Sequence, residues 1–247
     1  MEKDTVIKVE GLTKRFGSFT AVDNINLEVH RGEIFGFLGA NGAGKTTAMR
    51  MLCGLSIPTS GKGTVAGYDI FTRAEEIKRH IGYMSQKFSL YARLTVMENL
   101  RLFATIYGMT DAQIRSRADE LFQKLGMNNM RNTQVRDLPT GWKQKLAFAA
   151  ATIHRPDIVF LDEPTGGVDP ITRRKFWELI YSTSQEGVTV FVTTHYLDEA
   201  EYCNRISIMV DGQIKDIDSP AALKKKYGAE TIDRVFRIVA KDARRNE

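Results

Sequence analysis

The feature that most constrains this chain is a glycine-rich octapeptide, which reads Gly39-Ala40-Asn41-Gly42-Ala43-Gly44-Lys45-Thr46. It matches the pattern G-x-x-x-x-G-K-[ST] and lies between the apolar run 34–38 and a segment of helical composition at 46–55. Glycines let a backbone wrap a phosphate with its N–H groups pointing inward, and a helix N-terminus adds positive potential. The order of buried strand, glycine loop and helix therefore predicts a phosphate site that begins a βαβ unit.

Two side chains at the end of this loop have a predicted chemistry. The Lys45 ammonium can reach the β- and γ-phosphates of a nucleotide, and the Thr46 hydroxyl can bind Mg²⁺. An ordinary glycine turn is the alternative interpretation. The flanking strand and helix favour the phosphate site, because its mechanism requires both.

Two carboxylates end a second apolar strand. Residues 158–161 read Ile-Val-Phe-Leu, and Asp162 and Glu163 follow directly. A carboxylate at the tip of such a strand can hold Mg²⁺ directly or through water, and the next one can orient or deprotonate an attacking water. A strand that ends in solvated acids is common by itself. The phosphate loop in the same chain favours the functional interpretation.

Apolar periodicity divides the chain into α/β parts at both ends and a helical part between about Gln86 and His154. Alternation predicts half-exposed strands at 6–10 and 25–29. Helical spacing predicts at least two helices over 95–125, broken near 108–111, where Thr110 or Asp111 can cap the second. The other predicted elements are helices at 74–80, 141–154 and 173–185, short strands within 61–68, strands at 158–161 and 188–193, a hairpin at 206–217 around Asp211-Gly212, and a charged helical tail after Pro220 with a weakly placed strand at 235–239.

Composition excludes several classes of protein. The 247 residues are 43% hydrophobic and 26% charged, as in ordinary globular chains, and no apolar run approaches the ~20 residues that a membrane helix needs. Residues 1–4 carry no apolar signal region, so we do not expect secretion. Two cysteines, Cys53 and Cys203, cannot form a disulfide framework and favour reduced thiols in a cytosolic protein. The net charge of +5 suits a membrane surface or an acidic partner.

Three motifs together resemble those of the ATP-binding cassette (ABC) ATPases. They are Asn41 to Thr47, Leu161-Asp162-Glu163-Pro164-Thr165 and Thr193-Thr194-His195, and the resemblance covers about residues 6–217. It implies an α/β fold, a P-loop NTPase (RecA-like) core with an N-terminal antiparallel β-subdomain and an inserted α-helical subdomain. We expect the core and β-subdomain at 5–85 and 155–220, the helical subdomain at 86–154, and a C-terminal tail at 221–247.

The resemblance also implies which residues contact ATP. Phe16 lies where an aromatic residue stacks on adenine, with a core phenylalanine as the alternative. Val22 is expected beside the nucleotide. The expected phosphate contacts are Gly39, Ala40, Asn41, Gly42, Ala43, Gly44, Lys45, Thr46 and Thr47.

For catalysis the resemblance implies a second group of residues. Glu163 is expected to activate the attacking water, and Lys45 to hold the phosphates. Gln86 matches the glutamine loop, which touches Mg²⁺ or the attacking water and senses the transporter. His195 follows an apolar strand, as does the family's switch histidine, which contacts the γ-phosphate. The expected Mg²⁺ ligands are Thr46, Gln86 and Asp162.

One motif departs from the family pattern. The usual Leu-Ser-Gly-Gly-Gln signature, which caps the γ-phosphate bound to the opposite subunit, aligns with Leu138, Pro139, Thr140, Gly141 and Trp142. Pro139 has neither a hydroxyl nor an N–H, but the next three N–H groups and the helix dipole survive. We expect an altered, functioning cap, in which Thr140 is the N-cap or lends its hydroxyl to phosphate. Asp169 ends the D-loop, which crosses the same dimer interface.

These features imply a nucleotide-binding subunit of an ABC transporter, which binds and hydrolyses Mg-ATP in a sandwich dimer with a second ATPase subunit, identical or different. Integral membrane permease subunits would perform the transport, so we expect a cytoplasmic chain, peripheral on the inner face of the cell membrane. Phe88, Leu90 and Tyr91 could receive a helix of such a partner, with local packing as the alternative. The stretches 90–100 and 166–170 resemble ATPase subunits of bacterial ABC-2-type exporters.

Three other functions are the alternatives. A degenerate cassette would bind ATP with little hydrolysis, as the altered signature permits. A non-transport ABC ATPase is disfavoured by the single compact cassette, and we expect no nucleic acid partner. A small-molecule kinase would share residues 39–46 but would not explain Gln86, Glu163 and His195 together.

Overall fold

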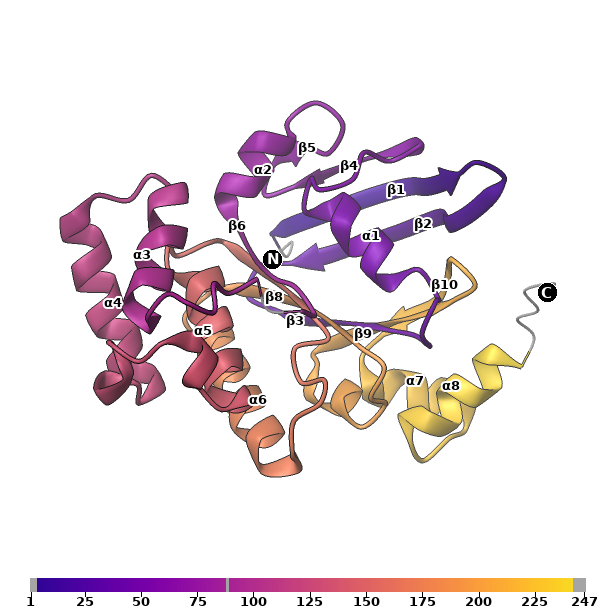
Figure 1. Cartoon of the computed structure of the whole chain (residues 1–247). Helices are drawn as coiled ribbons and strands as arrows, with labels where there is room; N and C mark the ends of the chain where they lie inside the picture. The colour runs from indigo at the N-terminus through magenta and orange to yellow at the C-terminus, as the bar shows by residue number, and fades with distance from the viewer. Residues whose placement is uncertain (1–3, 88, 242–247) are drawn as a thin grey trace.

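The computed structural model describes residues 4–87 and 89–241, which form two β-sheets flanked by helices (Figure 1). Phe88, predicted to meet a partner, lies outside the described residues, as does the predicted tail beyond residue 241. The first sheet is antiparallel, in the order β2-β1-β4-β5. Its strands are β1 (Thr5–Phe16), β2 (Phe19–His30), β4 (Ser60–Val65) and β5 (Tyr68–Asp69).

The second sheet has six strands in the order β10-β9-β3-β8-β7-β6. Its central strand β3 has parallel neighbours, β8 and β9, and β7 and β6 continue the parallel run beyond β8. β3, β7 and β8 are buried along their whole length, which explains the largely apolar sequences of β3 and β7. The strands are β3 (Ile34–Leu38), β6 (Ile81–Met84), β7 (Ile158–Asp162), β8 (Thr189–Thr194), β9 (Arg205–Val210) and β10 (Gln213–Asp218).

Turn residues explain where the hairpins form. Asp211 and Gly212 connect β9 to β10 with φ angles of 50° and 82°, as a type I′ turn requires, and the predicted hairpin is confirmed. β1 and β2 are longer than predicted, because both continue to a tight turn at residues 17–18, where Gly17 has a φ of 59°. The predicted α/β fold with an antiparallel β part and a helical part is confirmed.

The helices begin at residues with capping side chains. Thr95 and Thr110 form capping boxes with Glu98 and Gln113, so Thr110 rather than Asp111 caps its helix. The α-helices are α1 (Lys45–Leu52), α2 (Ala74–His80), α3 (Val96–Ile106), α4 (Asp111–Leu125), α5 (Thr140–Thr152), α6 (Pro170–Gln185), α7 (Pro220–Tyr227) and α8 (Ile232–Ala240). Short 3₁₀ turns lie at Asn128–Met130, Val135–Asp137 and Glu199–Tyr202.

The strand predicted at 235–239 is wrong. This segment lies in α8, which Thr231 caps through the N–H of Arg234. The apolar residues of this helix that pack on the core include Ile232, Val235, Phe236 and Val239, which have the spacing of one helix face, and Ile232 and Val235 are buried. The β-branched residues favour a strand locally, and packing against the core overrides that preference.

Three apolar cores hold the elements in place. Alternate residues of β3 and β7 face two of them, one shared with the antiparallel sheet and α1, the other with α6, α7 and α8. The third core lies among α3, α4 and α5, which form one end of the molecule in Figure 1. α5 belongs to two cores, because its Phe148 packs in the core with α6, α7 and α8 and its Leu146 packs in the core with α3 and α4. In the described part of the chain, no helix combines the length and apolarity needed to cross a membrane.

Candidate active site

The phosphate loop joins β3 to α1, and two of its glycines leave no room for a side chain. A Cβ on Gly39 would lie 2.6 Å from the carbonyl oxygen of Met209. A Cβ on Gly44, whose φ is 102°, would lie 2.4 Å from the carbonyl oxygen of Ala21. The loop conformation therefore depends on glycine at both positions.

The turn of the β9–β10 hairpin holds this loop from outside. The Gly212 N–H donates to the Ala43 carbonyl at 3.0 Å, and the Gly212 carbonyl accepts from the Asp23 N–H at 2.8 Å. Asp23 also accepts from the Gln213 side chain at 2.7 Å. The two sheets and the phosphate loop thus meet at a single turn.

Lys45, the first residue of α1, has a buried side chain. Its ammonium donates to the carbonyls of Gly39 at 2.7 Å and Ala40 at 3.1 Å, and lies 3.4 Å from Glu163 Oε1. Burial lowers the pKa of Lys45, and the Glu163 charge opposes that shift. The cation therefore lies at the centre of the loop, where phosphate oxygens would be attracted to it.

Asp162 ends β7 under the phosphate loop. Its Oδ1 accepts from the Thr193 hydroxyl at 2.7 Å and from the Thr46 hydroxyl at 3.3 Å. Burial raises the pKa of Asp162, and these two hydroxyls oppose the shift. Thr193 was not predicted to have a role of its own, because its place opposite Asp162 depends on the β7–β8 register.

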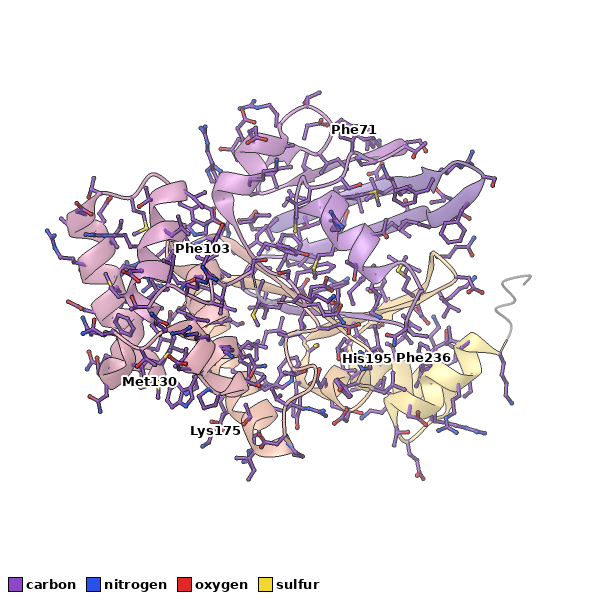
Figure 2. The ribbon with its side chains drawn as sticks, viewed as in Figure 1. Phe71, Phe103, Met130, Lys175, His195 and Phe236 are labelled. Atoms are coloured by element: carbon purple, nitrogen blue, oxygen red, sulfur yellow. The ribbon has the colours of Figure 1, made fainter. Side chains whose placement is uncertain are left out.

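Glu163 turns the chain out of the sheet with a φ of 47°, and its N–H donates to Thr193 Oγ1 at 3.0 Å. The Gln86 amide donates to Glu163 Oε2 at 2.9 Å. His195 Nδ1 lies 3.1 Å from the same oxygen but is not aligned as a hydrogen-bond donor. Figure 2 labels His195, in the lower half of the view. The four side chains predicted for catalysis, Lys45, Gln86, Glu163 and His195, come from segments far apart in sequence and thus meet at the Glu163 carboxyl group.

Lys45, Gln86 and Glu163 border a pocket of about 350 Å³ beside the phosphate loop, whereas His195 and Asp162 do not line it. Among the predicted phosphate contacts, Gly39, Ala40 and Ala43 belong to the loop but do not line the pocket. The residues that line it are Phe19, Ala21, Asn41, Gly42, Gly44, Lys45, Thr46, Thr47, Gln86 and Glu163.

The aromatic side chain that lines the pocket is Phe19, which sequence reasoning missed. Phe16 is its partner across the β1–β2 turn, and both rings are about half-exposed. The Lys14 ammonium lies 5.1 Å from the centre of the Phe16 ring. Val22 is fully buried. The sequence signal that could have indicated Phe19 is an aromatic residue just after the glycine turn at residues 17–18. Adenine stacking by Phe16 stays a prediction.

The altered signature lies at a second pocket, of about 390 Å³, which shares no lining residue with the first. Pro139 is the N-cap of α5 and Thr140 is its first residue. Of the two roles expected for Thr140, the N-cap is therefore wrong, and a hydroxyl that contacts phosphate stays a prediction. The Pro139 carbonyl accepts from the N–H groups of Trp142 and Lys143 at 3.0 and 3.1 Å. Proline fits an N-cap backbone, but it supplies no side-chain cap.

Gly141, Trp142 and Asp169 border the same pocket, whereas Leu138 does not. Leu138 is buried in the helical core, and Lys145 lies over the Trp142 ring at 4.5 Å. A Cβ on Gly141 would lie 3.0 Å from a methyl of Thr172, so α5 and α6 approach closely here. Asp169 caps α6, accepting from the Thr172 hydroxyl at 2.6 Å and from two N–H groups, and these bonds lower the pKa of Asp169.

Comparison with known proteins gives consistent matches. Residues 22–166 match the family described as ABC transporter. The "Probable multidrug ABC transporter ATP-binding protein YbhF" of Escherichia coli is 48% identical over 221 residues, which are 90% of this chain and 38% of that protein. The chain thus spans about two fifths of that relative. The "Linearmycin resistance ATP-binding protein LnrL" of Bacillus subtilis is 35% identical over 92% of this chain and 73% of its own length.

A solved structure adds a geometric comparison. It is titled "Dimeric structure of a post-hydrolysis state of the ATP-binding cassette MJ0796 bound to ADP and Pi". It superposes with a TM-score of 0.78 at 28% identity, over 86% of this chain and 98% of the other.

Proposed function

This chain belongs to the ABC transporter family, with the fold of its ATP-binding cassette ATPases, and from that premise we propose that it is the ATP-hydrolysing subunit of an exporter. The observation that carries the proposal is the convergence on Glu163. Lys45, Gln86 and His195 all lie within 3.4 Å of its two carboxyl oxygens. A glycine turn or a simple nucleotide-binding module does not require such a group.

The residues at the loop fit Mg²⁺ together with ATP. The Thr46 hydroxyl and Asp162 Oδ1, 3.3 Å apart, are hard oxygen donors of the kind that Mg²⁺ binds, and the Gln86 carbonyl oxygen is a third candidate. No cluster of three or more His, Cys, Asp or Glu able to hold a metal occurs in the described part of the chain. This fits an ion that takes most of its coordination from phosphates and water. Such an ion would neutralise charge on the phosphate oxygens.

Glu163 is the group that would accept a proton from the attacking water. Its side chain is only 10% exposed, and the Gln86 amide holds one of its oxygens. His195 lies beside that oxygen, where its ring can contact the terminal phosphate. Lys45 supplies positive charge next to the phosphoryl oxygens, whose charge the site must stabilise during transfer.

We propose that the signature pocket receives the ATP bound to a second ATPase subunit. The start of α5 offers the N–H groups of Thr140 and Gly141, which precede the first intrahelical hydrogen bond, and the positive end of the helix dipole. Both favour phosphate. The Thr140 hydroxyl is exposed beside them. Because this pocket is separate from the phosphate-loop pocket, the two halves of each ATP site would come from different subunits. ATP would then stabilise the dimer until hydrolysis removes the bridging phosphate.

The membrane partner would dock in a groove of about 470 Å³ between the core and the helical part. It is lined by Tyr83, Leu90, Phe103, Ile106 and Tyr107, among others, and the Ile106 side chain is 69% exposed. Leu90 belongs to the face predicted to receive a partner, and that face follows Gln86 directly. A partner helix here would bind next to a residue of the active site, on the inner face of the membrane. Relatives named for multidrug transport and for linearmycin resistance support an exporter.

The decisive experiment is Mg-ATP hydrolysis by the purified chain, comparing the native sequence with Glu163→Gln. We expect turnover that falls by roughly 10²–10⁴-fold in the variant, because a positioned general base is lost. Size-exclusion chromatography with ATP should show a stable dimer of Glu163→Gln. ATP binding without turnover in either protein would contradict hydrolysis by this chain alone and would favour the degenerate cassette.

The membrane partner is tested by binding to vesicles that contain a candidate permease subunit of an ABC exporter. Ile106→Asp places a charge in the apolar groove and should abolish binding. Ile57→Asp is the matched control, because Ile57 is 68% exposed but does not line the groove. Equal binding by both variants would exclude the groove as the docking site.

A further inference from the structure

A buried carboxyl group lies behind the candidate active site, and no proposed step uses it. Glu199 begins the 3₁₀ turn Glu199–Tyr202 and is 0% exposed. A carboxylate in such a place is costly unless it is paired and hydrogen-bonded. Glu199 has three partners, and they come from three segments of the chain.

Two partners are hydroxyls beside the proposed catalytic residues. The Thr165 hydroxyl donates to Glu199 Oε1 at 2.5 Å, and the Thr194 hydroxyl donates to Oε2 at 2.7 Å. Thr165 lies two residues after Glu163, and Thr194 directly precedes His195. One carboxyl group therefore joins the segments that carry the proposed base and the switch histidine.

The third partner is Arg173 on α6. Its Nε lies 3.6 Å from Glu199 Oε1, and its guanidinium lies 4.1 Å from the centre of the Tyr196 ring. The Tyr196 ring in turn contacts the His195 ring, with centroids 4.2 Å apart. Arg173 lies one turn after Asp169, which borders the signature pocket. A chain of contacts through Tyr196 and Arg173 therefore connects His195 to the helix that borders the signature pocket.

The segment after Glu163 is also held from its other side. Gln144 of α5 is buried, and its amide donates to the Pro164 carbonyl. Residues 164–165 therefore lie between the helix that begins at the signature and Glu199. Because Gln144 holds residues 164–165, the Glu199 contacts set the position of residues 193–196 relative to that segment.

We propose that Glu199 is a positioning residue, whose carboxyl group fixes residues 193–196 against the segment after Glu163 and against α6. It thereby sets where His195 lies relative to the Glu163 carboxyl group, without contacting ATP itself. The inference rests on the proposed function, because it assigns Glu199 a part in the same hydrolysis. Replacing the carboxylate by an amide removes the ion pair with Arg173 and one of the two acceptors, and leaves the volume unchanged.

The first test observes the His195 ring directly and needs no turnover. The chain has four histidines, and His195→Gln identifies the His195 signal in ¹H–¹⁵N spectra of the labelled full chain. Glu199→Gln should shift the His195 ring signals and leave those of the other three unchanged. Glu201→Gln is the matched control, since it removes a carboxylate from the same turn whose partner is Lys224, at 2.8 Å.

A second pair of variants tests the same proposal in case the Glu199→Gln protein does not fold. Thr194→Val removes the hydroxyl that donates to Glu199, and Thr194→Ser retains it. Thr194→Val should shift the His195 signals, and Thr194→Ser should restore them. Unchanged His195 signals in folded Glu199→Gln or Thr194→Val would overturn the proposal.

Kinetics supply the second readout. Glu199→Gln should lower kcat by about tenfold or more, with a KM for ATP unchanged within about twofold, because a displaced His195 acts only on transfer. In a His195→Ala background the same substitution should change kcat little, since the residue through which it acts is already gone. Full additivity of the two effects would overturn the proposal. If the native chain does not hydrolyse ATP, the proposed function fails, and the ring spectra still decide the role of Glu199.

Discussion

Replacing Pro139 by serine should change the stability of the single subunit little and the affinity of the ATP-bound dimer strongly. Pro139 has φ −57° and ψ 154°, an N-cap backbone that serine adopts without strain. A serine cap contributes about 1 kcal/mol, and losing the proline costs about 0.4–1 kcal/mol through the unfolded state. The two nearly cancel, so the stability of the single subunit should change by less than about 1 kcal/mol, or a few degrees in Tm.

The ATP-bound dimer should respond far more. The serine hydroxyl can accept from the helix and donate to phosphate at once, and a charge-assisted hydrogen bond is worth about 1.5–3 kcal/mol. A homodimer has two such sites, which gives about 3–6 kcal/mol and tightens dimerisation by roughly 10²–10⁴-fold. The assay is sedimentation of Glu163→Gln with Mg-ATP, alone and combined with Pro139→Ser. Pro139→Ala is the control, since it removes the ring without adding a hydroxyl. Equal dimer affinities for the Ser and Ala variants would refute the reasoning.

Three further predictions concern stability. Burial lowers the pKa of His154 to about 4 from 6.5. Between these two pH values the unfolded chain binds a proton that the folded chain does not, so the free energy of unfolding falls as the pH drops, by up to about 3 kcal/mol. His154→Gln should reduce this pH dependence, measured by urea unfolding at about pH 7 and about pH 4.5. Gly42→Ala, with open space around its Cβ, should cost about 1–2 kcal/mol, whereas Gly44→Ala, which clashes with backbone, should cost more and abolish the thermal stabilisation by Mg-ATP. Leu146→Ala, fully buried in the helical core, should cost about 2–5 kcal/mol in urea unfolding, and a smaller loss would show that the site collapses.

Local patterns predicted the elements whose ends are marked by strong signals. The strand at 34–38 and the helix at 74–80 have the predicted bounds, the former because a continuous apolar run ends directly at Gly39. The error at 235–239 arose where strand propensity and helical periodicity coincide, and only the core beneath α8 decides between them. Periodicity over a full turn was the better guide there.

The candidate site divides in the same way. The loop at 39–46 and the pair Asp162-Glu163 were visible because their chemistry lies in consecutive residues. Thr193 and Glu199 were not, since each acts through a partner about thirty residues away, which strand order and register bring close. Sequence spacing alone contains no information about such pairs.

The central place of β3 has a consequence for the order in which this protein is made. β3 is complete at residue 38, yet its neighbours β8 and β9 are residues 189–210, and the turn that holds the phosphate loop is at Gly212. While the ribosome is still translating the helical part, β3 has no strand to pair with, whereas the antiparallel sheet is already complete by residue 69. A nascent chain therefore exposes a five-residue apolar strand until β8 begins at residue 189, and its ATP site is complete only after Gly212 has been added. Chaperone demand and proteolytic sensitivity should concentrate in that interval.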